Sequence, residues 1–174
     1  MKQPNLNTQR LLLRPLSLAD SAKIQELAGN WAVAKTTLSI PHPYRYGMAE
    51  KWILSLEGAW NTRSGLAFGV LLKTDQEIIG VVSLVSISDK KAELGYWIGE
   101  QYWGKGYCTE ATEALMRLAS KQLQITNFVA EHLTENPASG KVMLKLGMVH
   151  LHSVERTDRN GKLAQIETYG SNHT

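Results

Sequence analysis

The chain has 174 residues, of which 43% are hydrophobic and 20% charged, and its formal net charge is +3. These values suit one globular domain over residues 1–174, and the lack of any run of like charges argues against nucleic-acid binding. A single cysteine excludes an internal disulfide framework, and no apolar stretch is long enough to cross a bilayer. We therefore expect a cytoplasmic protein that binds no membrane, with its last few residues as a loose tail.

The N-terminal part of the chain predicts a strand followed by helices. Residues 8–16 (TQRLLLRPL) form the strand, which Pro15 closes. Ser17 and Asp20 are cap-type residues and predict a helix directly afterwards. A shorter helix is expected at 31–37, before the loop PHPYRYG, whose two prolines exclude a helix.

The rest of the chain alternates strands with helices. Two branched apolar runs around the turn TDQE predict a hairpin, and DRNG predicts a second hairpin near the end. The expected strands are 66–73, 78–87, 91–98, 128–133, 148–156 and 163–169, and the expected helices are 48–61, 109–122 and 137–146. This order predicts an α/β (α+β) fold with a mixed, mostly antiparallel sheet of about seven strands and helices on both faces.

A glycine-rich loop, GKGYC, precedes the clearest predicted helix. Glycines at a helix start let the backbone approach a phosphate, and the unpaired N–H groups there favour an anion. The P-loop pattern is absent, and the dinucleotide pattern G-x-G-x-x-G fails at Thr109. The loop alone leaves two interpretations open: a cradle for the phosphates of a nucleotide-containing ligand, and a connection without a ligand.

A second motif, ENPASGKVMLKLGM, follows a predicted strand about thirty residues later. Its Asn, Pro and Gly are residues that commonly mark the start and the end of a helix. In this order, however, TQRLLLRPL, IPHPY, IIGVVSL, AELGYWIGEQYWGKGYCTEA and ENPASGKVMLKLGM resemble the GNAT N-acetyltransferases. The resemblance is greatest to the branch that acetylates the N-termini of ribosomal proteins.

The resemblance implies an enzyme that moves an acetyl group from acetyl-CoA directly to a primary amine, without a metal. The acceptor would be a protein N-terminal α-amine or a small amine, and the enzyme a monomer or homodimer. The alternative is a non-catalytic acyl-CoA-binding module with the same fold. Met143 keeps this alternative open, because many relatives have a general-acid tyrosine in that slot.

The resemblance also assigns the donor site. The backbone of Trp97, Ile98 and Gly99 would pair with the pantetheine arm, and Asn136 and Ser139 would lie toward the thiol. The family's loop pattern matches literally at 101–106, but the register 103–108 fits the distance to the helix better. The residues expected at the pyrophosphate are Trp103, Gly104, Lys105, Gly106, Tyr107, Cys108 and Thr109.

Two residues are candidates for catalysis. Glu93, on the strand before the loop, would be the general base, although it also suits a surface charge beside Lys90 and Lys91. Ser139 would be the partner of the coenzyme A sulfur. Cys108 at a helix start suggests a covalent nucleophile, but the family transfers the acetyl group directly, so we favour a packing role.

The acceptor side is expected to be aromatic. The resemblance suggests that it is lined by Trp31, Pro41, His42, Pro43 and Tyr44. For Trp52 and Trp60 we expect packing inside the protein instead. The five histidines form no zinc pattern with the single cysteine.

Overall fold

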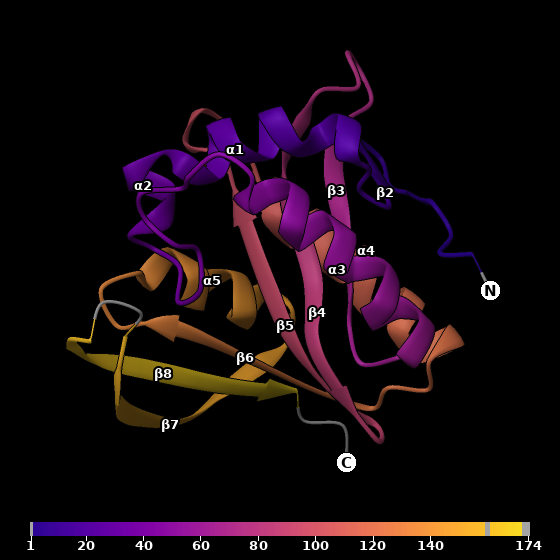
Figure 1. The fold of residues 1–174 in the computed structure, drawn as a ribbon. Helices are drawn as coiled ribbons and strands as arrows, with labels where there is room; N and C mark the ends of the chain where they lie inside the picture. The colour runs from indigo at the N-terminus through magenta and orange to yellow at the C-terminus, as the bar shows by residue number, and fades with distance from the viewer. Residues whose placement is uncertain (1, 159–160, 172–174) are drawn as a thin grey trace.

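The computed structural model describes residues 2–158 and 161–171, so the expected C-terminal tail and part of the DRNG turn lie outside the described residues. An eight-stranded sheet has the order β1-β2-β3-β4-β5-β6-β8-β7 (Figure 1). One strand more than predicted is found, because a two-residue strand precedes the first predicted strand. β1 (Leu6–Asn7) folds back on β2 (Leu11–Arg14), and the turn is closed by the bond from Thr8 N–H to the Leu11 carbonyl.

The other elements lie close to their predicted positions. The remaining strands are β3 (Leu66–Leu72), β4 (Ile78–Ser88), β5 (Lys91–Ile98), β6 (Asn127–Leu133), β7 (Met148–Thr157) and β8 (Leu163–Ser171). The helices are α1 (Ser21–Gly29), α2 (Trp31–Ala34), α3 (Met48–Thr62), α4 (Tyr107–Gln122) and α5 (Pro137–Lys145), with 3₁₀ turns at Leu18–Asp20 and Glu100–Tyr102. Helix α4 begins two residues before the predicted Thr109, so Tyr107 and Cys108 belong to the helix and not to the loop.

The pairing of β5 with β6 is the parallel part of an otherwise antiparallel sheet. It runs from Lys91↔Asn127 to Leu94↔Ala130 and then stops. Beyond this point β5 stays paired with β4 as far as Ile98, whereas β6 stays paired with β8. The sheet therefore opens between the ends of β5 and β6, as Figure 1 shows.

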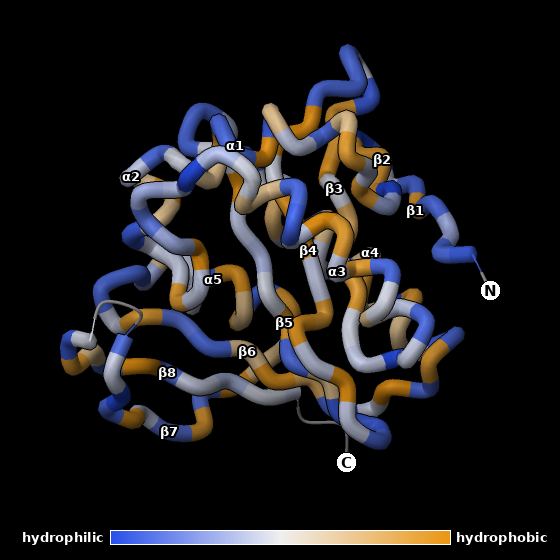
Figure 2. The backbone as a smooth tube through the Cα atoms, viewed as in Figure 1, coloured by the Kyte–Doolittle hydropathy of each residue, from blue (hydrophilic) through white to orange (hydrophobic). Residues whose placement is uncertain are grey.

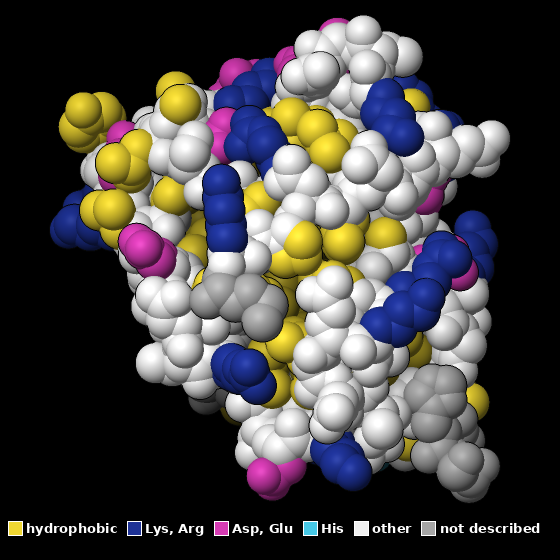
Figure 3. All heavy atoms as spheres, turned by 90° about the vertical axis from the view of Figure 1, so that its right-hand side faces the viewer, with side chains coloured by type: hydrophobic (Ala, Val, Ile, Leu, Met, Phe, Trp, Pro, Cys, Tyr) yellow, Lys and Arg dark blue, Asp and Glu magenta, His cyan; other side chains and the backbone are white. Residues whose placement is uncertain are grey.

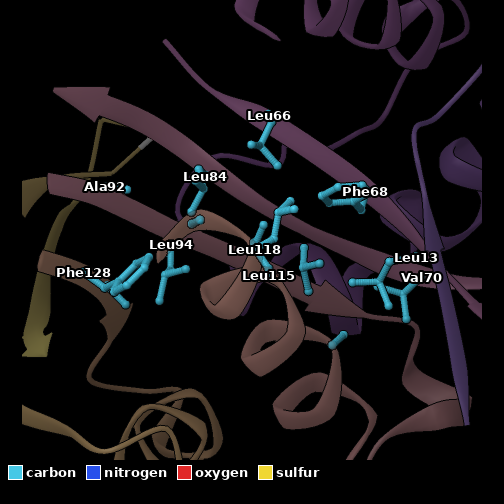
Figure 4. Packing of buried hydrophobic residues seen from close by; sticks show 14 of the residues in the cluster. Leu13, Leu66, Phe68, Val70, Leu84, Ala92, Leu94, Leu115, Leu118 and Phe128 are labelled. Atoms are coloured by element: carbon cyan, nitrogen blue, oxygen red, sulfur yellow. The ribbon is translucent and has the colours of Figure 1, made fainter. Parts of the chain in front are cut away.

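Helices cover both faces of the sheet, as predicted. Ile24 and Leu27 of α1 and Ile53 of α3 pack on one face. Leu115 and Leu118 of α4 pack on the other, against side chains of β2 to β6 that include Leu13, Val70, Leu94 and Phe128 (Figure 4). Hydrophobic residues accordingly concentrate along the central strands (Figure 2). No described helix is long and apolar enough to cross a membrane.

A buried ion pair fixes the entry to α1. Asp20 is 7% exposed and accepts two hydrogen bonds of 2.8 Å from the Arg14 guanidinium and one of 2.7 Å from the Ser17 N–H. Burial alone would raise the pKa of Asp20, but the bonds from Arg14 and Ser17 outweigh it, and the pKa lies below its ordinary value. The strand β2 and the first helical turn are thus joined by a charge-assisted bond.

The substitution Asp20→Asn tests this joint. We expect it to lower the free energy of unfolding by about 2–3 kcal/mol at pH 7, because it removes a paired buried charge. A folded-state pKa below the unfolded value means that the stabilisation is complete above about pH 4 and is lost as pH falls further. The difference from wild type in urea unfolding should therefore shrink in acid.

Glu26→Gln is the matched control. Glu26 pairs with Lys23 at 3.2 Å, but its side chain is 63% exposed. An exposed pair of this kind contributes less than about 1 kcal/mol. Equal effects of the two substitutions would contradict the role given to Asp20.

Candidate functional site

The site is framed by the opening between β5 and β6. The N–H of Gly99 donates to the Ile79 carbonyl on β4 at 2.8 Å. Since backbone groups alternate in direction along an antiparallel pair, those of Tyr96 and Ile98 face away from β4, into the opening. Beyond Leu94, no strand of the described chain pairs with this edge of β5.

Trp103 takes one of the positions at this edge. Its indole Nε1 donates to the Ile98 carbonyl at 2.6 Å. The N–H of Ile98 and the backbone of Tyr96 remain directed at the opening. Of the three residues expected to offer backbone contacts, Ile98 directs its N–H at the opening, whereas Trp97 is paired in register with Val81 of β4. The Gly99 N–H donates to Ile79, and its carbonyl accepts the Tyr102 N–H at 2.9 Å.

The glycine loop has the backbone that an anion site needs. Gly104 and Gly106 have φ angles of 73° and 78°, a left-handed conformation that glycine adopts without strain. Within residues 2–158 and 161–171, the N–H groups from Gly104 to Thr109 have no hydrogen-bond acceptor. These N–H groups and the positive end of the α4 dipole form a cradle suited to phosphate.

Arg10 holds this loop from outside, a role that no local sequence pattern predicted. Its guanidinium donates to Glu110 at 2.7 Å and to the Lys105 carbonyl at 2.8 Å, and lies 4.5 Å from the Tyr107 ring centroid. Thr8 also donates to Glu110, at 2.6 Å. Burial alone would raise the pKa of Glu110, but the bonds from Thr8 and Arg10 keep the pKa below its ordinary value. Glu110 is therefore an ionised anchor.

A groove continues from the loop between β1 and α4. Its lining includes Gly106, Thr109, Arg117 and Lys121, and its volume is about 910 Å³. Figure 3 views the side of the molecule that carries the N-terminal strands, where hydrophobic side chains lie in a recess between Lys and Arg side chains. Arg117 is paired with Glu113 at 3.3 Å. Among the described lining residues, Lys121 and Lys145 therefore supply the unpaired positive charge next to the cradle.

Helix α5 brings two of the predicted residues to the opening. The Asn136 amide donates to the Thr36 carbonyl at 3.1 Å, which ties α5 to the segment after α2. The Ser139 hydroxyl lies 3.0 Å from the Tyr96 hydroxyl of β5. Neither Thr36 nor Tyr96 was predicted from the sequence, because each meets α5 only through the packing of distant segments.

A glycine lets α5 approach the sheet this closely. A Cβ atom at Gly140 would lie 2.8 Å from His132 Nε2 and 3.2 Å from the Tyr169 hydroxyl. His132 is 5% exposed, and its Nε2 has no hydrogen-bond partner in the part of the chain that the structure describes. Any side chain at position 140 would push α5 outward and separate Ser139 from Tyr96.

Met143 and Cys108 are packed side chains. Met143 is 1% exposed and belongs to the core, so it presents no polar group to the opening. Cys108 packs against the same core, and burial raises the pKa of its thiol to about 12. The lowering that a helix start would cause is overcome, which argues against a thiolate nucleophile.

Glu93 lies on the face of β5 that also carries Trp97, just before the opening. It is half-buried and is paired in register with Val129. The Ser86 hydroxyl is 3.4 Å from its carboxylate. Among the described residues Glu93 makes no ion pair, and neither Lys90 nor Lys91 neutralises it.

The face that carries Trp97 also holds the aromatic residues of the expected acceptor side. Trp31 is 52% exposed, and its ring centroid lies 4.8 Å from that of His42. Tyr44 and Trp97 pack against the same two hydrophobic clusters. Trp52 and Trp60 pack against the hydrophobic clusters, as expected. No group of three or more His, Cys, Asp or Glu residues suited to a metal occurs among the described residues.

Comparisons with known proteins agree on one family. Residues 10–149 match the model described as "Acetyltransferase (GNAT) domain". The "Uncharacterized N-acetyltransferase p20" of Bacillus licheniformis is 29% identical over 150 residues, 81% of this chain and 80% of that protein. The ribosomal-protein-serine acetyltransferase of Escherichia coli (strain K12) is 32% identical over 87 residues, 49% of each chain.

A solved structure extends the likeness to the whole fold. RimL, described as a ribosomal L7/L12 alpha-N-protein acetyltransferase in complex with coenzyme A, has a TM-score of 0.84 at 19% identity. The alignment covers 94% of each chain.

The thiol of Cys108 offers a test that needs no ligand. With a pKa of about 12, only about one thiol in ten thousand is ionised at pH 8, against roughly a quarter for an ordinary cysteine. Alkylation by iodoacetamide should therefore be at least a hundredfold slower in the folded protein than in urea. Because the chain has one cysteine, the signal is unambiguous. Equal rates would mean an accessible thiol of ordinary pKa, and a faster rate in the folded protein would mean an activated one.

Proposed function

The chain belongs to the acetyltransferase (GNAT) domain family, and we propose that it transfers the acetyl group of acetyl-CoA directly to the α-amine at a protein N-terminus. The observation that supports this most is the row of unpaired N–H groups from Gly104 to Thr109, beside an open strand edge. Phosphate and an amide-containing arm are the two chemical features of coenzyme A that such a surface can bind.

In this proposal the donor lies across the opening. The loop N–H groups bind the pyrophosphate, and Lys105 supplies positive charge nearby. Arg10, paired with Glu110, holds the loop in place. The backbone of Tyr96 and Ile98 binds the amides of the pantetheine arm as an added strand would. The thioester then reaches the space beside Asn136 and Ser139.

The acceptor would enter from the face that carries Trp31 and His42. It must attack as a neutral amine, and an α-amino group with a pKa of about 7.7–8.0 needs only a modest base. Glu93 is the proposed base, acting through water, because its carboxylate has no cationic partner among the described residues. The ribosomal-protein-serine acetyltransferase among the relatives supports a protein N-terminus as acceptor.

A substrate panel tests this function. Purified protein is given acetyl-CoA with peptides that begin in Ser or Ala, the same peptides blocked at the α-amine, and small polyamines. We expect thiol release with the free peptides and a mass increase of one acetyl group at the N-terminus. Turnover with polyamines alone would reassign the acceptor, and coenzyme A binding without any turnover would favour a non-catalytic module.

Gly106→Ala tests the donor cradle separately. A side chain in the left-handed region costs about 1–2 kcal/mol, and relaxing it should rotate the loop N–H groups away from the pyrophosphate. We expect the Kd for coenzyme A, measured by calorimetry, to rise at least tenfold.

Gly147→Ala is the matched control. Gly147 has a φ of 79° and open space around its Cβ position, so the backbone strain is the same. It ends α5 and lies outside the cradle. Similar losses of coenzyme A affinity in the two variants would show that general destabilisation, and not the cradle, is responsible.

A further inference from the structure

A pair of hydroxyl groups bridges β5 and α5. The Ser139 hydroxyl donates to the Tyr96 hydroxyl at 3.0 Å, and the Tyr96 hydroxyl donates to the Ser139 carbonyl oxygen at 3.0 Å. Tyr96 lies two residues beyond Leu94, where the pairing of β5 with β6 ends. The contact therefore joins the edge that would bind the donor to the helix that carries Ser139.

The Tyr96 hydroxyl can stop donating to the Ser139 carbonyl without leaving that carbonyl unpaired. Ser139 lies in α5, where its carbonyl also accepts the N–H of Met143 in the helical ladder. Tyr96 can consequently donate to Ser139 Oγ instead. Burial raises the pKa of Tyr96 above its ordinary value, with a smaller opposing effect of the Ser139 hydrogen bond. Tyr96 thus stays a neutral donor across the working pH range.

We propose that Tyr96 is a positioning residue: when the donor fills the opening, its hydroxyl donates to Ser139 Oγ and turns the Ser139 proton toward the coenzyme A sulfur. The inference rests on the proposed function, which places the sulfur beside Ser139. Tyr96 itself need not touch the reacting atoms. Together the two hydroxyls supply a hydrogen bond to the sulfur. Met143, which is 1% exposed in the core, has no group that could donate one.

The step balances without proton transfer from either side chain. The amine nitrogen forms a bond to the thioester carbon, the carbon–sulfur bond breaks, and its electron pair goes to sulfur. The developing thiolate accepts the Ser139 hydrogen bond, which Tyr96 strengthens from behind. The proton released by the amine passes through water to Glu93, the proposed base, and from there to solvent. The free thiolate takes up a proton from solvent after it leaves.

Double substitution tests the coupling in turnover. Tyr96→Phe removes one hydroxyl and keeps the ring, and Ser139→Ala removes the other. Each should lower kcat about tenfold, the value of one or two hydrogen bonds, with KM for acetyl-CoA within about twofold. If the residues act as a unit, the double variant is no slower than Ser139→Ala, whereas independent effects would multiply to about a hundredfold and overturn the inference.

Tyr169→Phe is the matched control. Tyr169 is a neighbouring tyrosine, and its hydroxyl has no hydrogen bond among residues 2–158 and 161–171. The kcat of Tyr169→Phe should lie within about twofold of that of wild type. A loss equal to that of Tyr96→Phe would mean that removing any hydroxyl here is harmful, and would count against the specific role of Tyr96.

A second measurement does not depend on turnover. The ultraviolet absorbance of the thiolate reports the pKa of coenzyme A bound to the protein. In wild type we expect this pKa to lie below that of free coenzyme A titrated in the same buffer, and to rise by about one unit in Tyr96→Phe and in Ser139→Ala but not in Tyr169→Phe. An identical thiol pKa in Tyr96→Phe and wild type overturns the inference, even if wild type acetylates peptides.

The outcomes separate the two proposals. A shifted thiol pKa without turnover on any amine would sink the proposed function and keep the hydroxyl pair at the sulfur. If Tyr96→Phe is too unstable to measure, 3-fluorotyrosine at position 96 supplies a more acidic hydroxyl in a folded protein. The bound thiol pKa should then fall below that of wild type, and an unchanged value would contradict the inference.

Discussion

The end of the parallel pairing between β5 and β6 is the constraint on which the site depends. Each strand continues with its other neighbour, β5 with β4 and β6 with β8, so the two edges separate beyond Leu94 and Ala130. A separated edge carries N–H and C=O groups that need partners. A ligand with amide groups along an extended arm can supply them, which links the topology of the sheet to the chemistry of the donor.

The surroundings of the opening hold it in a single geometry. Arg10 and Glu110 fix the loop on one side, and Asn136 and Gly140 fix the position of α5 on the other. Preorganised N–H groups cost no rearrangement when an anion arrives. Cys108 remains an inert packing group at a helix start because it packs against the core and burial raises the pKa of its thiol.

Local sequence patterns predicted most of the fold and part of the site. Helix α4, the β3–β4 hairpin and the glycine loop each follow from periodicity, turn residues or backbone freedom over a few positions. The missed features join distant parts of the chain. Arg10 meets Glu110 across 100 residues, Asn136 meets Thr36 across 100, and Tyr96 meets Ser139 across 43. Such contacts depend on the packing of α4 and α5, which no local pattern specifies.

The contact between Arg10 and the loop couples donor binding to the stability of the N-terminal strands. Thr8 and Arg10, in the turn between β1 and β2, bond to Glu110 and to the loop. A ligand that stabilises the loop should therefore also stabilise β1 and β2. By thermodynamic reciprocity the coupling free energy is equal in both directions. Donor binding should thus slow amide exchange in the N-terminal strands. Conversely, a fusion partner that strains the first ten residues would weaken donor affinity from a distance, without touching the site.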